Sequence, residues 1–176
     1  VEHRGILDYD CPTQWIDTPL EGAHEEFVGE SFGRVNRQEA KLCVQTLRDY
    51  YMKIGRARAL DEQIDVGVIS PYRAQVQYLR QLVRSDEWLR PLRRLITINT
   101  VDGFQGQERD IIIISLVRAN DDGQIGFLAD LRRMNVAITR ARMKLIIIGN
   151  ADTLARHKFY KELHQYVMGL AEQPEI

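Results

Sequence analysis

The chain has 176 residues, of which 44% are apolar, which is enough for one domain with a buried core and short for two. Its 24 basic and 25 acidic residues give a net charge of −1, so a surface that binds nucleic acid must be a local patch and not an overall positive field. Cys11 and Cys43 are far apart, which argues against a zinc cluster or a disulfide framework and is typical of a reducing compartment.

The sequence contains no predicted membrane span and no export signal. Its longest strongly apolar run, Ile111 to Val117, is far shorter than the roughly 18 to 20 residues that a membrane span requires. The chain starts without a basic and apolar leader. We therefore expect no membrane partner and a cytoplasmic protein, and the start at Val1 indicates a piece of a longer one. His157 and His164 have no acidic or Cys partners at matching spacing, so no metal site is expected.

The first part of the chain predicts one long helix after an irregular start. Residues 1–35 are expected to be irregular, with a short strand near Trp15, and to lead into a single domain over residues 36–176. Asn36 and Glu39 form a capping-box pattern, and the apolar residues that follow recur at helical spacing. We therefore predict a helix over residues 37–54.

The remainder alternates between strands and helices. Residues 65–70, 96–99, 110–117 and 144–149 are predicted strands, nearly continuous in apolar character, as in strands covered on both faces. One helix is predicted from Pro71 onward and another over residues 151–169. Between them, a third helix is predicted around an apolar stripe of Leu131, Met134, Ile138 and Ala141. This alternation predicts a doubly wound α/β fold, with a mostly parallel sheet and helices on both faces.

Ligands of such sheets gather at the carboxyl ends of the strands, here after Ser70, Asn99 and Gly149. The segment Asn99-Thr-Val-Asp-Gly-Phe-Gln-Gly-Gln-Glu-Arg-Asp110 has two glycines three residues apart, which let the backbone approach a ligand closely. It is followed by Arg132-Arg-Met-Asn-Val-Ala-Ile-Thr-Arg-Ala-Arg142. On a helical wheel, Arg133 and Arg140 lie roughly 20° apart and nearly opposite the apolar stripe. Taken alone, the first segment is more simply interpreted as a polar turn, and the second as a solvated charged helix face.

In this order and spacing, the two segments resemble the fifth and sixth motifs of superfamily 1 helicases, in the branch that includes the nonsense-mediated-decay RNA helicase. Ser70-Pro-Tyr-Arg-Ala-Gln75 is similar to the fourth motif of this family. The resemblance covers about residues 69–150 and implies a RecA-like lobe. Because no Gly-x-x-x-x-Gly-Lys-Ser/Thr string occurs, the lobe lacks the phosphate loop.

The resemblance implies the C-terminal motor lobe of an ATP-dependent helicase or translocase that is inactive as an ATPase alone. ATP and Mg²⁺ would lie between this lobe and an N-terminal lobe of the same polypeptide, which would carry the Mg²⁺ ligands. Movement from 5′ to 3′ is likewise implied by the resemblance alone.

The resemblance also implies roles for individual residues. Arg140 would be the catalytic arginine finger and would bind the nucleotide together with Gln105, Gly106 and Glu108. The residues expected along single-stranded DNA or RNA are Ser70, Pro71, Tyr72, Thr100 and Val101. Arg142 is a candidate for a salt bridge.

Three other functions are compatible with parts of the sequence. One is a non-catalytic α/β interaction or nucleic-acid-docking module derived from a helicase lobe. A Rossmann-type enzyme is disfavoured because no Gly-x-Gly-x-x-Gly follows a strand. A nuclease with a metal on Asp102, Glu108 and Asp110 is disfavoured because no lysine or further acid stands at matching spacing. Arg90, Arg93 and Arg94 form a cluster that could contact phosphates, although a solvated loop is the commoner outcome.

Overall fold

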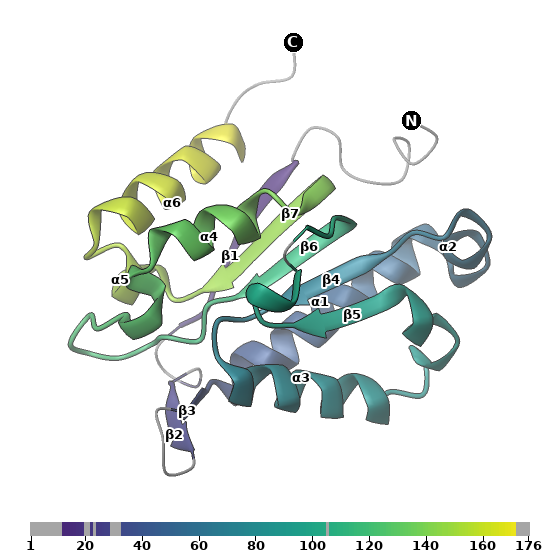
Figure 1. Cartoon of the computed structure of the whole chain (residues 1–176), viewed down its shortest axis with the longest axis horizontal. Helices are drawn as coiled ribbons and strands as arrows, with labels where there is room; N and C mark the ends of the chain where they lie inside the picture. The colour runs from purple at the N-terminus through teal and green to yellow at the C-terminus, as the bar shows by residue number, and fades with distance from the viewer. Residues whose placement is uncertain (1–11, 20–21, 23, 29–32, 105, 172–176) are drawn as a thin grey trace.

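The structure is a computed structural model of the chain and describes residues 12–19, 22, 24–28, 33–104 and 106–171. Its centre is a five-stranded sheet of order β1-β7-β6-β4-β5, in which all four strand pairs are parallel. Helices cover both faces (Figure 1), so the chain has the predicted doubly wound α/β, RecA-like fold. The strands are β1 Thr13–Asp17, β4 Val66–Ile69, β5 Ile96–Asn99, β6 Arg109–Ser115 and β7 Ala141–Gly149.

The two faces of the sheet have separate cores, and β6 contributes to both. Ile111 and Ile113 belong to the core under the first helices, whereas Ile112 and Ile114 belong to the core on the opposite face. This explains why four consecutive positions of β6, Ile111 to Ile114, are all apolar. The helices on the first face are α1 Arg37–Ile54, α2 Arg56–Glu62 and α3 Arg73–Ser85, and the short helix η2 Arg90–Leu95 leads into β5.

The elements that cover the opposite face are η3 Asp102–Phe104, η4 Gly126–Ala129, α4 Leu131–Ile138, α5 Ala151–Leu154 and α6 Lys158–Ala171. The single closing helix predicted over residues 151–169 is therefore two helices. The turn between them is fixed by His157, whose Nε2 lies 2.7 Å from the Gly123 carbonyl oxygen. None of the described helices combines the length and apolar character of a membrane-spanning segment.

The start of the chain is more regular than the sequence predicted. β1 is the edge strand of the main sheet, and Trp15 is buried there and donates its Nε1–H to the Gly149 carbonyl oxygen at 3.2 Å. β2 Glu26–Val28 and β3 Gly33–Val35 form an antiparallel hairpin. The expected boundary after residue 35 is thus not a boundary of the sheet, because part of residues 1–35 completes it.

The helix expected to carry both Arg133 and Arg140 ends too early for that. α4 stops at Ile138, and Ala141 is already the first residue of β7. The helical-wheel comparison is therefore wrong, because Arg140 lies in the turn between helix and strand. Of the predicted stripe, Met134 is buried in the core, whereas Leu131 is exposed.

Candidate functional site

The carboxyl ends of β4 and β5 bring two predicted nucleic-acid residues together. The Ser70 N–H donates to the Asn99 carbonyl oxygen at 3.3 Å, so Ser70 and Thr100, each the first residue after its strand, are neighbours at this edge. Ser70 is fully buried, whereas Thr100 is partly exposed. Thr100 is therefore the residue of this pair that a ligand can reach.

Two further predicted residues have buried side chains. Val101 packs into the core beside Phe104. Tyr72 is only 3% exposed; its hydroxyl accepts from Arg118 at 3.1 Å and donates to the Ile125 carbonyl oxygen. Pro71, between Ser70 and Tyr72, is partly exposed. A ligand would thus meet the backbone of Val101 and not its side chain, and the Tyr72 ring is not free to stack on a base.

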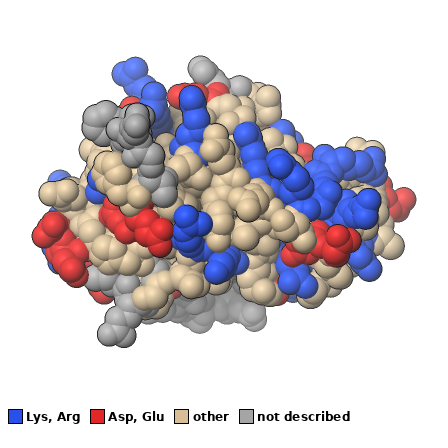
Figure 2. Space-filling model, turned by 90° about the horizontal axis from the view of Figure 1, so that it is seen from below, with Lys and Arg blue, Asp and Glu red and all other residues tan. Residues whose placement is uncertain are grey.

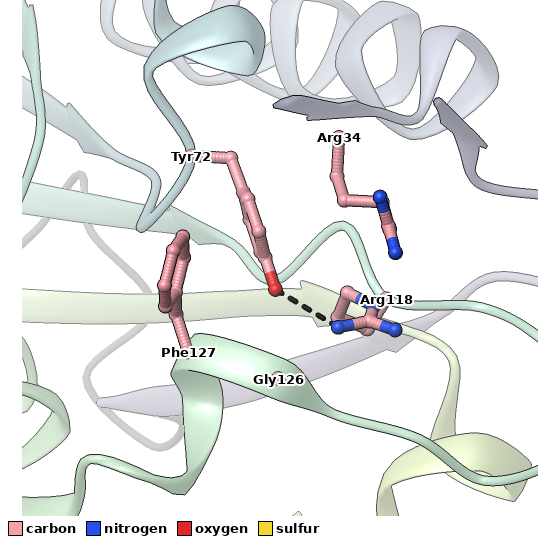
Figure 3. A pocket seen from close by; sticks show the side chains of 5 residues that line it. All are labelled: Arg34, Tyr72, Arg118, Gly126 and Phe127. Carbon is pink, nitrogen blue, oxygen red and sulfur yellow. Dashed lines mark hydrogen bonds between the residues drawn. The ribbon is translucent and has the colours of Figure 1, made fainter. Parts of the chain in front are cut away.

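A pocket of about 130 Å³ lies at this edge of the sheet, and no sequence pattern indicated it. Figure 3 shows Arg34 on β3 and Phe127 on opposite sides of the Tyr72 ring, with Arg118 at the Tyr72 hydroxyl. Glu25 holds both arginines, with 2.9 Å between its Oε2 and each Nε. The one sequence signal for Arg118 is its position directly after the strand predicted over residues 110–117, although β6 itself ends at Ser115. The pocket is lined by Arg34, Tyr72, Arg118, Gly126 and Phe127.

The segment that presents Arg118 has a strained backbone held by α1. Val117 has φ 69°, a left-handed conformation that is rare for a β-branched residue. The Asn36 side chain donates to the Val117 carbonyl oxygen at 3.1 Å, and the Val117 N–H donates to Glu39 Oε1 at 2.7 Å. The capping box is thus half formed: Asn36 caps the Glu39 N–H, but the Glu39 carboxylate holds Val117.

Glu39 and Gln75 connect this segment to both helices beneath it. Glu39 is fully buried, and burial raises the pKa of its carboxyl to about 7, against the lowering effect of the Val117 N–H and the Ser115 hydroxyl. Gln75, from the fourth-motif segment, donates to the Asn36 carbonyl oxygen at 3.0 Å and to Ser115 Oγ at 3.1 Å. Gln75 is therefore a buried connector, which its place in the sequence did not reveal.

The segment between β5 and β6 runs from the carboxyl edge of the sheet, where its strands end, back to the amino edge, where its strands begin. Its two glycines are required for different reasons. At Gly103 a Cβ would lie 2.2 Å from the Asn99 side chain, whereas Gly106 has φ +77° and open space around it. Glu108, near the end of the segment, is exposed. Gln105 lies outside the described residues.

Arg140 lies at the amino edge, next to Glu108. The Arg109 N–H donates to the Arg140 carbonyl oxygen at 3.0 Å, and Arg142 Nη1 donates to the Glu108 carbonyl oxygen at 3.4 Å. The half-buried Arg140 side chain donates its Nε–H to the Val136 carbonyl oxygen, at 3.2 Å, in the last turn of α4. The expectation of ligand residues at carboxyl ends therefore applies to Ser70 and Thr100, but not to Glu108 and Arg140.

Asp65 and Asp110 near this edge, and Asp102 in the loop after β5, are paired with arginines. Arg142 contacts Asp110 at 3.1 Å and Asp65 at 3.0 Å, which confirms it as a salt-bridge former. Burial lowers the pKa of Arg142, but these two carboxylates outweigh that effect and raise it. Asp102 contacts Arg133 at 3.5 Å. Within the described ranges, no three His, Cys, Asp or Glu side chains form a group that could hold a metal ion.

Comparison with known proteins identifies the family. A family profile described as "AAA domain" matches residues 2–152. The chain is 47% identical over 166 residues to the DNA polymerase alpha-associated DNA helicase A of Saccharomyces cerevisiae. The aligned residues cover 90% of this chain and 22% of that protein. It is 47% identical over 170 residues to an uncharacterized ATP-dependent helicase of Methanocaldococcus jannaschii, covering 97% of this chain and 22% of that protein.

A third relative is the regulator of nonsense transcripts 1 homolog of Neurospora crassa. It is 35% identical over 161 residues, which cover 89% of this chain and 14% of that protein. The chain therefore spans less than a quarter of the length of each of these relatives. On these findings the chain belongs to the AAA domain family and, within it, to the superfamily 1 helicases of the branch that contains the regulators of nonsense transcripts.

Proposed function

We propose that this chain is the C-terminal motor lobe of an ATP-dependent helicase or translocase that acts on single-stranded DNA or RNA. The observation that carries the proposal is the path of the segment from Thr100 to Glu108. It starts beside Ser70 at one edge of the sheet and ends beside Arg140 at the other. The two edges are about 20 Å apart along β6, at about 3.3 Å per residue. A movement at one end of this segment is thereby transmitted to the other.

ATP with Mg²⁺ is the cofactor that the family implies, and the amino edge has groups that suit the nucleotide. A Cβ at Gly106 would have no atom within 4 Å, so this backbone is open to a ligand. Glu108 is exposed and would meet the ribose hydroxyls. Gln105 would join them. When bound, ATP supplies the free energy of hydrolysis of its terminal phosphate.

Arg140 would be the arginine finger. Its guanidinium is planar and always charged, which suits the oxygens of a phosphoryl group during transfer. No carboxylate within the described residues neutralises it, and its contacts are the Val136 carbonyl oxygen and the Thr139 hydroxyl. A cation at the C-terminus of α4 is also favoured by the helix dipole. The side chain is therefore held at the edge while its charge stays available to an anion from outside the lobe.

The remaining parts of the site would come from another lobe. The chain has no phosphate-loop sequence, so we propose that an N-terminal lobe of the same polypeptide holds the β- and γ-phosphates and the Mg²⁺. This chain alone would then not hydrolyse ATP. At the opposite edge, the Thr100 hydroxyl and neighbouring backbone N–H groups would hold a phosphate of the single strand, with the buried Ser70 fixing their position.

The test is Arg140→Ala in a protein that carries both lobes. Single-strand-stimulated ATP hydrolysis should fall by about 10³- to 10⁵-fold, because the charge that stabilises phosphoryl transfer is lost. Single-strand affinity, measured by fluorescence anisotropy, should stay within about twofold, because no residue at the carboxyl edge changes. Arg140→Lys should rescue little of the rate, because the planar fork is absent.

The matched control is Lys161→Ala, which removes an exposed cation from α6 on the same face of the sheet. It should leave the stimulated rate unchanged. An undiminished rate in Arg140→Ala would contradict the arginine-finger role. ATP hydrolysis by this chain on its own would contradict the division of the site between two lobes.

A further inference from the structure

A row of arginines runs along α3 and continues into η2. Arg73, Arg80 and Arg84 lie within about 40° of one another on the helix, at 3.6 residues per turn, and all three are exposed. Arg93 and Arg94 follow in η2. We call these five residues the arginine stripe. Figure 2 shows Lys and Arg side chains gathered over this part of the molecule.

The stripe differs from the rest of the chain in its balance of charge. Residues 71–99 contain six arginines, no lysine and two acidic residues, although the whole chain has a net charge of −1. Elsewhere arginines are commonly paired with carboxylates, as in Arg34–Glu25 and Arg142–Asp110. Within the described part of the chain, no carboxylate forms an ion pair with any arginine of the stripe. The stripe is therefore a local positive field without its own counter-ions.

Two of these guanidinium groups are oriented without being neutralised. Arg80 donates its Nε–H and Nη2–H to the Ile98 carbonyl oxygen, at 2.9 and 2.7 Å. Arg93 donates to the Arg84 carbonyl oxygen. Backbone carbonyls fix the direction of these side chains but carry no net charge. The cations are thus already placed for an incoming anion, which lowers the entropy lost on binding.

Arg73 has no local explanation in the helix. Cations near the C-terminus of a helix are favoured by its dipole, which accounts for Arg84. Arg73, in contrast, is the first residue of α3, where a positive charge is unfavourable, and no acidic residue accompanies it in the first turn. A residue that opposes its local environment without compensation indicates a role outside the helix.

We propose that the arginine stripe binds the phosphate backbone of the nucleic-acid strand beyond Ser70 and Thr100, an inference that rests on the function proposed above. Arg73 directly follows Ser70-Pro71-Tyr72 at the carboxyl edge, so the stripe continues the single-strand site without a gap. From Arg73 to Arg84 the helix rises about 16 Å. That is the axial length of about five nucleotides of a stacked strand.

The chemistry of the surface favours a nucleic acid over a protein partner. Arginine forks match phosphate oxygens in two-point hydrogen bonds. Protein interfaces, in contrast, are built around apolar and aromatic residues in the centre. Among the described residues, the large exposed hydrophobic side chains all lie outside α3 and η2. The exposed positions between the arginines on α3 are polar, and include Gln77 and Gln81.

The test combines Arg73→Gln, Arg84→Gln and Arg94→Gln in a protein that carries both lobes. Anisotropy is measured with short and long oligothymidylates, of about 8 and 25 nucleotides, one within and one beyond the range of common site sizes. The matching oligouridylates replace them if they stimulate ATP hydrolysis more. The triple variant should bind the long oligomer on the order of tenfold more weakly at about 0.1 M salt, with a log–log salt slope smaller by about 2, at about 0.7 per lost phosphate contact. Affinity for the short oligomer should not change.

A charge-matched control is Lys41→Gln, Lys158→Gln and Lys161→Gln, which removes three exposed cations from α1 and α6 and should leave both affinities unchanged. Replacing the same three arginines by lysine should preserve most of the salt slope, since the charge remains. The proposal would be overturned if the variant with the three arginines changed to glutamine kept wild-type affinity for the long oligomer. It would also be overturned if the control with the three lysines changed to glutamine lost as much affinity. An acidic protein segment would then be the alternative partner.

Stimulation of ATP hydrolysis by the short oligomer tests the motor function separately. If it persists while the stripe variant shows no loss for the long oligomer, only the stripe is refuted. If no oligomer stimulates hydrolysis in the wild type, the motor function is refuted, and affinity for the long oligomer still decides the role of the stripe.

Discussion

Two arginines at opposite edges of the sheet, Arg118 and Arg140, are held in different ways. At the carboxyl edge, Arg118 has a side chain only 6% exposed and is bound by Glu25 and by the Tyr72 hydroxyl. At the amino edge, Arg140 is half-buried, and its side-chain hydrogen bonds within the described residues go to an uncharged carbonyl and a hydroxyl of its own helix end. The first arrangement is complete within this chain, whereas the second leaves a cation to be used by something outside it.

Solvent exposure explains why both arrangements are stable. A charge removed from water must be paired and hydrogen-bonded, because the cost of its desolvation amounts to several kcal/mol. A charge that keeps part of its hydration needs no partner, and pairing it adds little. The buried network of Arg118 therefore contributes to folding, while the surroundings of Arg140 have the character of a half-site. This difference can be tested by mutations whose expected effects decrease in order.

The largest effect on stability is expected for Glu25→Ala. Glu25 binds Arg118 and Arg34, and its side chain is 8% exposed. Its removal leaves Arg118 buried without a counter-charge, which should lower the free energy of unfolding by about 3 to 5 kcal/mol. Urea unfolding followed by circular dichroism measures this value.

The neighbouring Glu26→Ala provides the control for Glu25→Ala. Glu26 pairs with Arg37, and the two side chains are 54% and 48% exposed. Losing an exposed pair should cost less than about 1 kcal/mol. Equal losses in the two variants would contradict the view that the carboxyl edge is a completed, buried network.

A smaller and pH-dependent effect is expected for Glu39→Gln. Burial raises the pKa of Glu39 from 4.5 to about 7. Between these two values the folded chain holds a proton that the unfolded chain has lost, so stability falls as pH rises through this window. The total loss is at most about 3 kcal/mol, and glutamine, which cannot ionise, should lack it. Urea unfolding at several pH values between 4.5 and 8 measures the difference.

Glu162→Gln is the control for this pH dependence. Glu162 lies on the surface of α6 with 64% of its side chain exposed, so its replacement should leave the slope of stability against pH unchanged. Parallel slopes for wild type and Glu39→Gln would show that Glu39 is ionised in the fold and that the network holding Val117 carries a charge.

The elements that the sequence predicted well are those whose signals are local. The helix over residues 37–54 is found with these bounds, because capping and apolar spacing act within a few turns. The strand over residues 96–99 is likewise found as predicted. Arg140 was misplaced for the opposite reason. The helical apolar spacing continues through Ala141, but pairing of Ala141 with Arg109 in the sheet ends the helix first.

The networks of the carboxyl edge could not be predicted from local patterns. Glu39 was expected to close a capping box three residues away, yet it binds Val117, 78 positions along the chain. Glu25 binds Arg118, which is 93 positions away. Partners at such separations are chosen by tertiary packing, here of α1 against β6 and of Glu25 against the segment after β6. Motif resemblance pointed to Ser70 and Thr100 at this edge, but it gave no sign of Arg118 or of the pocket around it.

The smallest effect is expected where the loop after β5 meets α4. Asp102 and Arg133 form an ion pair between these two elements, with 68% and 54% of their side chains exposed. A double-mutant cycle with Asp102→Ala and Arg133→Ala should give a coupling energy below about 1 kcal/mol, because both charges are hydrated. Near 1 M salt, where charges are screened over about 3 Å, the coupling should vanish. A larger coupling that survives salt would mean that the loop and α4 are fixed to each other as firmly as Glu25 and Arg118. The segment from Thr100 to Glu108 would then have little freedom to shift, and the coupling of the two edges through it would lose its physical basis.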